Sequence, residues 1–373
     1  MREKAYVSDE LNCDYVFLIA TILLVILGTV MVYSSSFFVS QELYGSGMAM
    51  IKSHMLHAIV GAVLMFGLIR LDYRKLHSKG LILILLGLAM VSLALCFVPG
   101  IGVMGGHARR WINLRVVTLQ SSEFVKLILI LFLANFLSKK NLDITRFSTG
   151  ILPVLIVMGA IALMIFAEPD FGTAATIGIW TLIVLFVAGM RWKHLLSLAA
   201  LAVPIGIGMM VMAPYRRARL VSFLDPWQDM YGGGYQIIQS MVAFAKGGIF
   251  GVGLGEGTQK LFFLPAPHTD FILSSLGEEL GFLGVFGVIA LFGVWIWRGL
   301  KIAQATNDDF GFYLVVGSVT LIGLQAVLNM GVAMSVLPNK GLALPFFSCG
   351  GSTLVATMLI SGLVLSVSRS ARL

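Results

Sequence analysis

The stretch Leu264-Pro-Ala-Pro-His-Thr-Asp270, followed directly by Phe271-Ile-Leu-Ser-Ser-Leu-Gly-Glu278-Glu279, decides how the rest of the chain is interpreted. Two prolines interrupt the segment that leads to His268 and Asp270, and a long apolar run begins immediately after the acid. An ionisable side chain at the boundary of such a run is costly to bury and usually has a function. An equal alternative is that Thr269 or Asp270 only caps the helix that begins here.

The composition indicates that this apolar run lies in a membrane. Of 373 residues, 58% are hydrophobic and only 12% are charged, and the mean hydropathy is +0.94, which excludes a soluble domain and predicts an all-α polytopic membrane protein. The net charge of +8 comes from short basic clusters between apolar runs, so it indicates membrane orientation rather than nucleic-acid binding. Three cysteines without metal-like spacing predict neither a disulfide framework nor a zinc site.

Windows of about 20 apolar residues, the length that crosses a bilayer, predict about ten spans. They cover roughly residues 15–36, 53–71, 80–98, 122–137, 148–167, 172–190, 194–213, 270–297, 310–335 and 346–368. An even number of spans places both termini on one side, and the positive-inside rule makes that side the cytoplasm. The chain is therefore expected to form one membrane domain over 1–373, with a cytoplasmic segment 1–14 and a large extracytoplasmic loop 214–269.

The loops on the outer side carry basic residues that oppose this orientation. Headgroup anchoring or pairing with Asp225, Asp229 and Glu256 is one explanation for any single residue. For the whole set, an anionic ligand on the outer face is the better explanation, because guanidinium and ammonium groups suit phosphate oxygens. The set comprises Arg109, Arg110, Arg115, Arg216, Arg217, Arg219, Lys246, Lys260 and Lys340.

Several other polar groups lie near predicted span ends. Glu123 and Lys126, at i and i+3, share one helix face, so they form either a structural ion pair or part of a site. The turn Glu168-Pro-Asp170-Phe-Gly172 is first explained by turn and capping chemistry, with a catalytic role as the alternative. The run Gly251-Val-Gly-Leu-Gly-Glu-Gly257 lacks the spacing of a dinucleotide-binding loop and predicts flexible or tightly turned backbone.

The surroundings of Asp270 favour a working base. The proline-rich approach, the neighbouring His268 and the apolar helix are expected to raise the pKa of this carboxyl group toward that of a general base. Glu278 and Glu279 are expected to be buried or capping acids. The spacing of His268, Asp270 and Glu278 is poor for a metal, so no metal site is predicted.

Six motifs together resemble the SEDS family (shape, elongation, division and sporulation), and the resemblance extends from about residue 14 to 370. They are Met31-Val-Tyr-Ser-Ser-Ser36, Gly106-His-Ala-Arg109-Arg110-Trp111-Ile112, Leu119-Gln-Ser-Ser-Glu123, Glu168-Pro-Asp-Phe-Gly172, Leu264-Pro-Ala-Pro-His-Thr-Asp270 with Gly277-Glu-Glu279, and Leu337-Pro-Asn-Lys340-Gly-Leu-Ala-Leu-Pro345 with Ser348-Cys-Gly-Gly-Ser352.

The resemblance implies a ten-span glycosyltransferase of the bacterial cytoplasmic membrane. Such proteins polymerise lipid II into peptidoglycan strands beside a class B penicillin-binding protein, and their essential acid corresponds to Asp270. Substrate-binding roles are then expected for Arg109, Arg110, Lys126, Lys340, His268, Ser348 and Ser352, and supporting roles for Glu123, Glu168, Asp170, Thr269 and Glu278. The reaction requires no nucleotide or cofactor, although a divalent cation such as Mg²⁺ is compatible with it.

The lysine in Leu337-Pro-Asn-Lys-Gly341 and the early Met31-Val-Tyr-Ser34 pattern are more similar to the division type than to the elongation type. A division role implies the septum as the location and other division proteins as partners. The alternatives are an elongation-type polymerase, a lipid II flippase and a non-catalytic division scaffold. The sequence departs from the family pattern at three positions, with Ala266 in place of a glutamate, Ser121 in place of a proline and Cys349 in place of a tyrosine.

Overall fold

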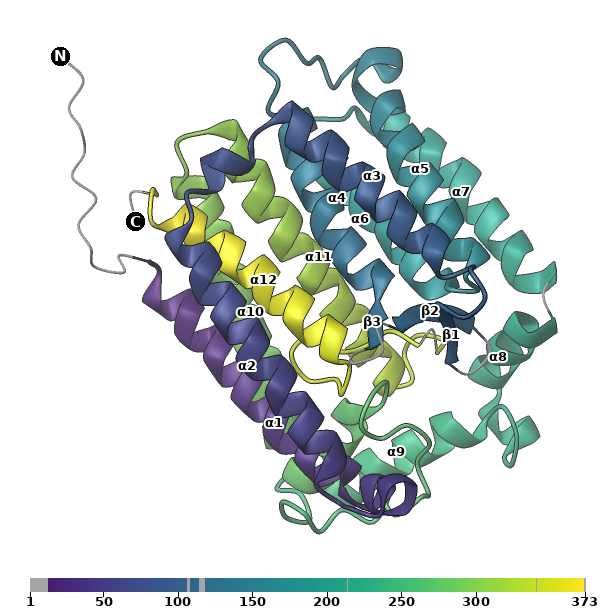
Figure 1. Ribbon diagram of the computed structural model, residues 1–373. Coiled ribbons are helices and arrows are strands. Elements are labelled where there is room, and N and C mark those ends of the chain that lie inside the picture. The colour runs from purple at the N-terminus through teal and green to yellow at the C-terminus, as the bar shows by residue number, and fades with distance from the viewer. Residues whose placement is uncertain (1–12, 106–107, 114–117, 213, 340, 372–373) are drawn as a thin grey trace.

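The computed structural model describes residues 13–105, 108–113, 118–212, 214–339 and 341–371, and most of them form helices (Figure 1). In chain order these are α1 (Tyr15–Tyr44), α2 (Ala49–Arg70), η1 (Tyr73–Leu76), α3 (Lys79–Leu95), α4 (Ser121–Leu137), η2 (Phe147–Ile151), α5 (Leu152–Ala167), α6 (Phe171–Val187), α7 (Trp192–Met212), α8 (Pro214–Leu224), η3 (Pro226–Asp229), α9 (Tyr235–Gly247), α10 (Ile272–Ala305), α11 (Asp309–Ala333) and α12 (Gly351–Ser368).

Each predicted span overlaps one of these helices, and the fold is a helical bundle as expected. Among the described residues, seven helical segments are long and apolar enough to cross a membrane. They are α1, α2, η2 with α5, α7, α10, α11 and α12, while α3 and α6 are shorter apolar helices. The polytopic membrane class is therefore confirmed, and the number of ten crossings stays a prediction.

The start of α1 and the end of α12 lie together at one end of the bundle (Figure 1). The Asp14 side chain caps α1 by accepting a hydrogen bond from the backbone N–H of Phe17 at 2.8 Å. Its backbone N–H donates to Ser368 at the end of α12 (3.1 Å), and its carboxylate pairs with Arg298 of α10 at 2.7 Å. This adjacency is what an even number of crossings requires.

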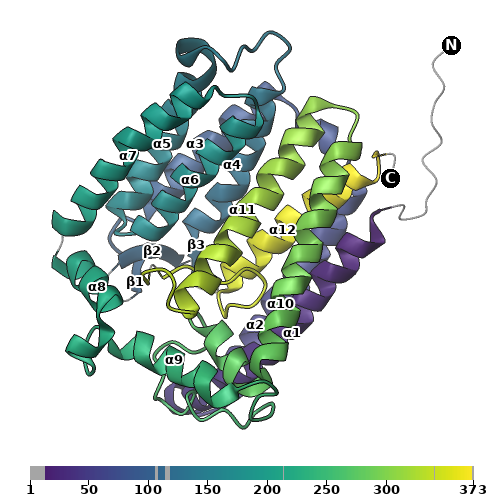
Figure 2. The ribbon, with the colours of Figure 1, turned by 180° about the vertical axis from the view of Figure 1, so that it is seen from behind.

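The centre of the bundle is formed by α11 and α12. Nearly every residue of α12 is buried, because α1, α2, α4, α10 and α11 all pack against it. In contrast, α7 has no buried residue and contacts α6 and α8 at the edge of the bundle (Figure 2). A water-soluble protein would not leave such an apolar helix uncovered, so α7 is suited to face lipid.

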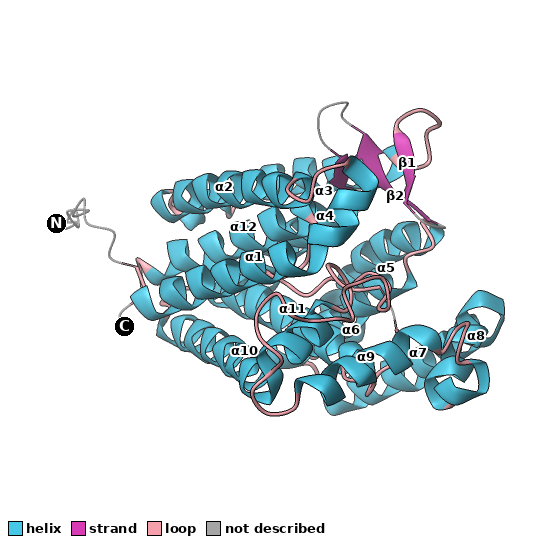
Figure 3. Cartoon of the chain, turned by 90° about the horizontal axis from the view of Figure 1, so that it is seen from below, coloured by secondary structure: helices cyan, strands magenta, loops and turns pink. Residues whose placement is uncertain are grey.

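A small antiparallel sheet lies at the opposite end of the bundle from the start of α1 and the end of α12, and the expectation of an all-α chain did not include it (Figure 3). Its strands β1 (Gly102–Gly105), β2 (Ala108–Asn113) and β3 (Thr118–Gln120) follow the order β1-β2-β3. Trp111 pairs with Gln120 in the register of β2 and β3, and α4 begins directly after β3. The sheet thereby fixes Arg110 relative to the start of α4.

The segment 214–269, expected to be a large loop, contains the short helices α8, η3 and α9. Figure 1 shows α9 at the lower end of the bundle, and α9 packs along α10. This segment and the sheet therefore cover the same end of the molecule, which we call the site end.

The helix α10 is broken at Gly281, whose φ of 65° and ψ of −163° are not helical. The backbone N–H groups of Phe282 and Leu283 donate to the carbonyls of Gly248 (2.8 Å) and Ile249 (3.2 Å) instead of continuing the helix. In return, Val252 and Gly253 donate to the carbonyls of Glu278 and Glu279, both at 3.0 Å. The glycine-rich loop thus satisfies backbone groups that a broken helix would leave unpaired.

This insertion explains why glycines are required at the end of α9 and in the loop that follows it. A Cβ on Gly247 would lie 1.9 Å from the Gly277 carbonyl oxygen, and one on Gly251 would lie 2.1 Å from that of Glu279. The backbones approach too closely for any side chain. The run from Gly251 to Gly257 is therefore fixed against the first half of α10, residues 272–280, which directly follows Asp270.

Candidate active site

Asp270 lies in the turn that precedes α10 and is partly buried at the site end. The amide of Asn329 on α11 donates both to the backbone carbonyl of Asp270 (3.0 Å) and to that of Leu342 (2.6 Å). Asn329 is buried, so this amide joins the loop that carries the acid to the loop that precedes α12. A Cβ on Gly341 would lie 3.6 Å from Asp270 Oδ2, which places the second loop directly beside the carboxylate.

The motif before α12 holds the loop that carries the acid from its other side. The backbone N–H of Cys349 donates to the His268 carbonyl at 3.0 Å. Ser348 is buried, and the Ser352 hydroxyl accepts a hydrogen bond from the Gln120 backbone N–H at 3.0 Å. Ser352 therefore connects α12 to the junction of β3 and α4. The Thr269 hydroxyl bonds within its own turn, to the Ala266 carbonyl at 3.4 Å.

Ala266 adopts a φ of 53°, in the left-handed region that non-glycine residues rarely occupy. This position belongs to the turn closed by the Thr269 N–H and the Ala266 carbonyl, 3.2 Å apart. The unusual backbone shape of the loop is therefore present without the glutamate that the family pattern has here.

Arg110 of β2 forms an ion pair at the site end with Asp170, the residue that precedes α6. The guanidinium Nη1 lies 3.6 Å from Asp170 Oδ2, and Nη2 donates to the Pro169 carbonyl at 3.1 Å. Asp170 also caps α6, accepting from the Thr173 backbone N–H at 3.1 Å and from its hydroxyl at 2.9 Å. The capping explanation for this acid is confirmed, and the same carboxylate also orients an arginine of the sheet.

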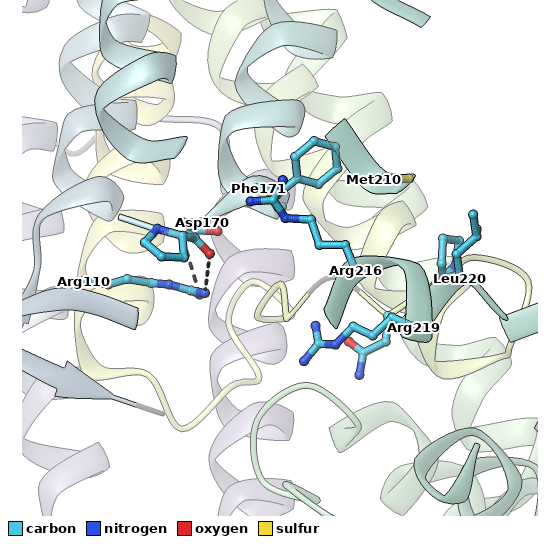
Figure 4. A pocket seen from close by; sticks show the side chains of 11 residues that line it. Arg110, Asp170, Phe171, Met210, Arg216, Arg219 and Leu220 are labelled. Atoms are coloured by element: carbon cyan, nitrogen blue, oxygen red, sulfur yellow. Dashed lines mark hydrogen bonds and ion pairs between the residues drawn. The ribbon is translucent and has the colours of Figure 1, made fainter. Parts of the chain in front are cut away.

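A small cavity, which we call the arginine cavity, opens beside this ion pair (Figure 4). One side is formed by Arg110 of β2 and by the turn before α6, which carries Asp170. The helix α8 contributes Arg216 and Arg219. In the close-up, Arg110 and Asp170 lie on one side and Arg219 and Leu220 on the other, with Arg216 between them. Its lining residues are Arg110, Pro169, Asp170, Phe171, Gly172, Met210, Arg216, Arg219, Leu220, Pro338 and Asn339.

Arg216 is held in place by residues of α5, α6 and α7. Its guanidinium carbon lies 4.8 Å from the ring centroid of Phe166 and 5.5 Å from that of Phe171, and Nη1 donates to the Met209 carbonyl at 3.1 Å. These contacts fix the planar group while leaving other N–H donors for a ligand. Three guanidinium groups around one cavity form an arrangement suited to an anion with several oxygens.

A second cavity of about 380 Å³, which we call the tyrosine cavity, adjoins the first and shares Arg219 and Asn339 with it. It lies between α8, the start of α9 and the loop before Asp270. Its lining residues are Ala218, Arg219, Tyr231, Gly232, Gly233, Tyr235, Gln236, Ile237, Pro265 and Asn339.

The electrostatic environment of Asp270 is dominated by burial. Loss of solvent raises the pKa of this carboxyl group above its ordinary value, Arg219 and Arg110 lower that pKa, and Asp170 raises it. All three of these charged neighbours line the arginine cavity. Burial also lowers the pKa of His268, whose Nδ1 is buried without a hydrogen-bond partner in the described part of the chain. The neutral form of this imidazole is therefore favoured.

Glu168, at the end of α5, is fully buried, and neither carboxylate oxygen has a hydrogen-bond partner among the described residues. Burial raises the pKa of this carboxyl group to about 8, the neighbouring Cys96 and Arg110 lower it, and Asp170 raises it. Glu168 is therefore expected to be protonated near neutral pH, behind the ion pair that Asp170 forms with Arg110.

The predicted pair of Glu123 and Lys126 is confirmed, with Nζ 2.8 Å from Oε1 and both side chains buried in α4. Lys126 lines neither cavity, so the structure gives no direct contact for the diphosphate-binding role expected of it. Glu278 faces the glycine-rich loop, where it accepts hydrogen bonds from the backbone N–H groups of Thr258 and Gln259 at 3.0 Å. Its observed role is to attach that loop to α10.

Lys260, expected among the external cations, instead forms a buried ion pair with Glu279 at 2.7 Å. Glu279 also accepts hydrogen bonds from Ser34 on α1 (2.6 Å) and from the Gly255 backbone N–H (3.1 Å). Among the described residues, this lysine is thus occupied in joining α1, α10 and the loop, and we do not assign it to ligand binding.

Three predicted cations cannot be placed in the site, and one of them, Arg115, lies wholly outside the described residues. Lys340 and the side chain of Arg109 lie outside the described part of the molecule, although the Arg109 backbone pairs with Met104 between β1 and β2. Within the described ranges, no three metal-ligating side chains gather.

Sequence reasoning missed three features of the site. Asn329 lies within a mostly apolar helix that also carries Gln325, so a carboxamide in this predicted span did not single it out. Arg216 and Arg219 were expected to bind an anionic ligand as members of the external set, but neither was singled out as a residue of the site. The pairing of Lys260 with Glu279 had no local signal, because the backbone must reverse direction to bring the two together.

These observations define a class: a membrane-spanning helical protein with a polar site at one end, where three arginines surround a cavity and two of them act electrostatically on a partly buried acid. The chain belongs to the cell cycle protein family of FtsW, RodA and SpoVE, whose model matches residues 14–373. It is 42% identical to the probable peptidoglycan glycosyltransferase FtsW of Geobacter metallireducens, covering 95% of this chain and 94% of that protein. It is 38% identical to the stage V sporulation protein E of Bacillus subtilis, covering 98% and 99%.

Solved structures agree with this assignment. A chain from a peptidoglycan synthase complex that coordinates polymerization and crosslinking superposes with a TM-score of 0.77 at 30% identity, covering 96% of this chain and 98% of that one. The rod shape determining protein RodA of Thermus thermophilus superposes with a TM-score of 0.70 at 28% identity, covering 97% and 98%. The fold expected from the resemblance is confirmed.

Proposed function

We propose that this protein is a peptidoglycan glycosyltransferase that polymerises lipid II into glycan strands during cell division. The observation that carries the proposal is the arginine cavity at one end of a membrane-spanning bundle, because its Arg110, Asp170 and Arg219 act electrostatically on Asp270. A lipid-linked diphosphate combines an anion with an apolar tail, and this arrangement suits both parts. The curated relatives named FtsW support the division type, since they are 41–42% identical over 95% of the chain.

In this mechanism the arginines bind the diphosphate of the donor. Arg110 is held by Asp170 and Arg216 by two aromatic rings, so both are positioned before a ligand arrives. Guanidinium groups fixed in advance stabilise the negative charge that develops as the diphosphate leaves, at little reorganisation cost. Arg109, Lys126 and Lys340 are proposed to add positive charge around the same substrate.

Asp270 is proposed as the general base. Its carboxylate accepts the proton from the 4-hydroxyl of an acceptor lipid II, whose oxygen attacks the anomeric carbon of the donor. The new glycosidic C–O bond forms as the bond to the diphosphate breaks, with inversion, and the leaving diphosphate takes the electron pair. A pKa raised by burial makes Asp270 a stronger base than an exposed aspartate, and the nearby arginines keep its ionised form accessible.

The remaining assignments follow from this reaction. His268, Ser348 and Ser352 are proposed to shape the site around the substrate, and Glu123, Glu168, Asp170, Thr269 and Glu278 to support it. We place both termini in the cytoplasm and the site end outside, in the bacterial cytoplasmic membrane at the septum. A class B penicillin-binding protein and other division proteins are the proposed partners, a view supported by the synthase complex that this fold resembles.

The proposal is tested with purified protein, its cognate penicillin-binding protein and fluorescent lipid II in liposomes. We expect wild-type protein to make glycan strands, and Asp270→Asn to make none while remaining folded and membrane-inserted. Translocation of lipid II without polymer would instead support the flippase alternative, which needs cationic groups accessible from both faces.

A further inference from the structure

The two cavities at the site end differ in chemistry although they adjoin. The arginine cavity presents three guanidinium groups and the Asp170 carboxylate. The tyrosine cavity has Arg219 as its one charged residue among those described, and otherwise presents Tyr231, Tyr235, Gln236, Asn339 and Pro265 with glycine backbone. A diphosphate suits the first, while the second suits a neutral ligand with hydroxyl and amide groups, because phenol rings and carboxamides combine apolar surface with hydrogen bonding.

The polar groups of the tyrosine cavity are arranged in advance. The Asn339 amide donates to Gln236 Oε1 at 3.0 Å, and Asn339 Oδ1 accepts from the Gly341 backbone N–H at 3.0 Å. The first bond uses the carbonyl of Gln236 and leaves its Nε2 group as a donor for a ligand. Since Gly341 lies beside the Asp270 carboxylate, the same bonds connect the tyrosine cavity to the acid.

Tyr231 has little structural role, because it lies at the edge of the cavity with 91% of the residue's surface exposed. An exposed aromatic ring at the mouth of a neutral polar cavity offers a flat apolar face for the C–H side of a sugar ring. Tyr235, at the start of α9, supplies a second, more buried ring.

We propose that the tyrosine cavity binds the neutral, N-acetylated saccharide of a lipid-diphosphate-linked substrate while the arginine cavity binds its diphosphate. Arg219 and Asn339, which line both cavities, then lie where the sugar joins the phosphate, at the bond that the reaction breaks. Pro265 comes from the loop that carries Asp270, so a substrate spanning both cavities extends toward the base. This inference rests on the proposed function and names the residues that retain the glycan strand between additions.

The test compares Tyr231→Ala and Tyr235→Ala with wild-type protein in lipid II polymerisation. Loss of one aromatic contact is expected to raise KM about 2- to 10-fold and to shorten the strands, while kcat stays within about twofold. Tyr235→Phe keeps the ring and is expected to retain most of the affinity, which separates ring contact from folding. Tyr44→Ala is the matched control, because Tyr44 is 64% exposed and lines neither cavity.

Undecaprenyl diphosphate, which has no sugar, separates the two cavities. As an inhibitor it is expected to bind the tyrosine variants as tightly as wild-type protein, whereas Arg216→Gln should weaken it. Equal weakening by the tyrosine variants, or an unchanged KM and strand length in both of them, would overturn the saccharide assignment. Failure of the proposed function is distinguishable, because wild-type protein itself would then make no polymer.

Discussion

The buried ion pair between Lys260 and Glu279 is expected to stabilise the half-helix that follows Asp270. The side chains are 3% and 1% exposed, and their N···O distance is 2.7 Å. In Lys260→Met the carboxylate of Glu279 stays buried without its counter-ion, although Ser34 and the Gly255 backbone N–H still donate to it. Because breaking a buried pair from one side leaves an uncompensated charge, we expect a loss of about 3–5 kcal/mol in the free energy of unfolding.

This loss corresponds to a fall in Tm of about 6–10 °C, taking ~2 °C per kcal/mol for a long chain. The measurement is thermal unfolding of purified protein in detergent, followed by tryptophan fluorescence. In the double variant Lys260→Met/Glu279→Gln, the neutral amide still accepts hydrogen bonds from Ser34 and Gly255, so much of the loss should be recovered.

The exposed pair of Arg146 with Asp143 provides the control. It has a similar N···O distance of 3.1 Å, but its side chains are 73% and 48% exposed. Arg146→Met is therefore expected to change stability by less than about 0.5 kcal/mol. If Lys260→Met unfolded within about 1 °C of wild type, or if the double variant were no more stable than the single one, the pair would not stabilise this region as described.

Three further predictions concern titration and positioning. Arg219→Gln removes a cation that lowers the pKa of Asp270, so the acid limb of the kcat/KM profile should move to higher pH, and a limb that stays in place would contradict the electrostatic coupling. Glu168 has an ordinary pKa of 4.5 when unfolded and about 8 when folded, so only the folded state keeps its proton between these values and stability should fall as pH rises through them. Glu168→Gln should remove that slope from a series of Tm measurements between pH 5 and 8. Asn329→Ala releases two backbone carbonyls that hold the Asp270 loop, so kcat should fall at least about tenfold with little change in KM, whereas a rise in KM alone would argue for a role in binding.

Much of the fold could be predicted from apolar length alone. Every predicted span overlaps a helix, because about 20 apolar residues without charge have few alternatives to a helix in a membrane. The sheet formed by β1, β2 and β3 was not predicted, since its strands are short and their pairing depends on contacts outside each strand. The helices α8 and α9 were likewise not predicted, because they lie in the segment 214–269, which was expected to be an extracytoplasmic loop.

The site shows the same limit more sharply. The sequence identified Asp270 and the excess of external cations, because a charge in an apolar setting is visible locally. It could not show that the glycine run would enter the break at Gly281, since that break is defined by hydrogen bonds to Gly248 and Ile249. For the same reason, Lys260 was expected to bind an anionic ligand, whereas it is occupied by Glu279.

The central claim is that Asp270 acts as a general base and does not merely cap α10. Asp270 is not the N-cap residue of α10, because the helix begins at Ile272 and Phe271 occupies the N-cap position without a side-chain hydrogen bond. The most direct measurement is polymerisation of fluorescent lipid II by wild-type protein and Asp270→Asn, each with and without the cognate class B penicillin-binding protein. Strands from the wild type and none from folded Asp270→Asn would agree with a general base. Long strands from Asp270→Asn would contradict it.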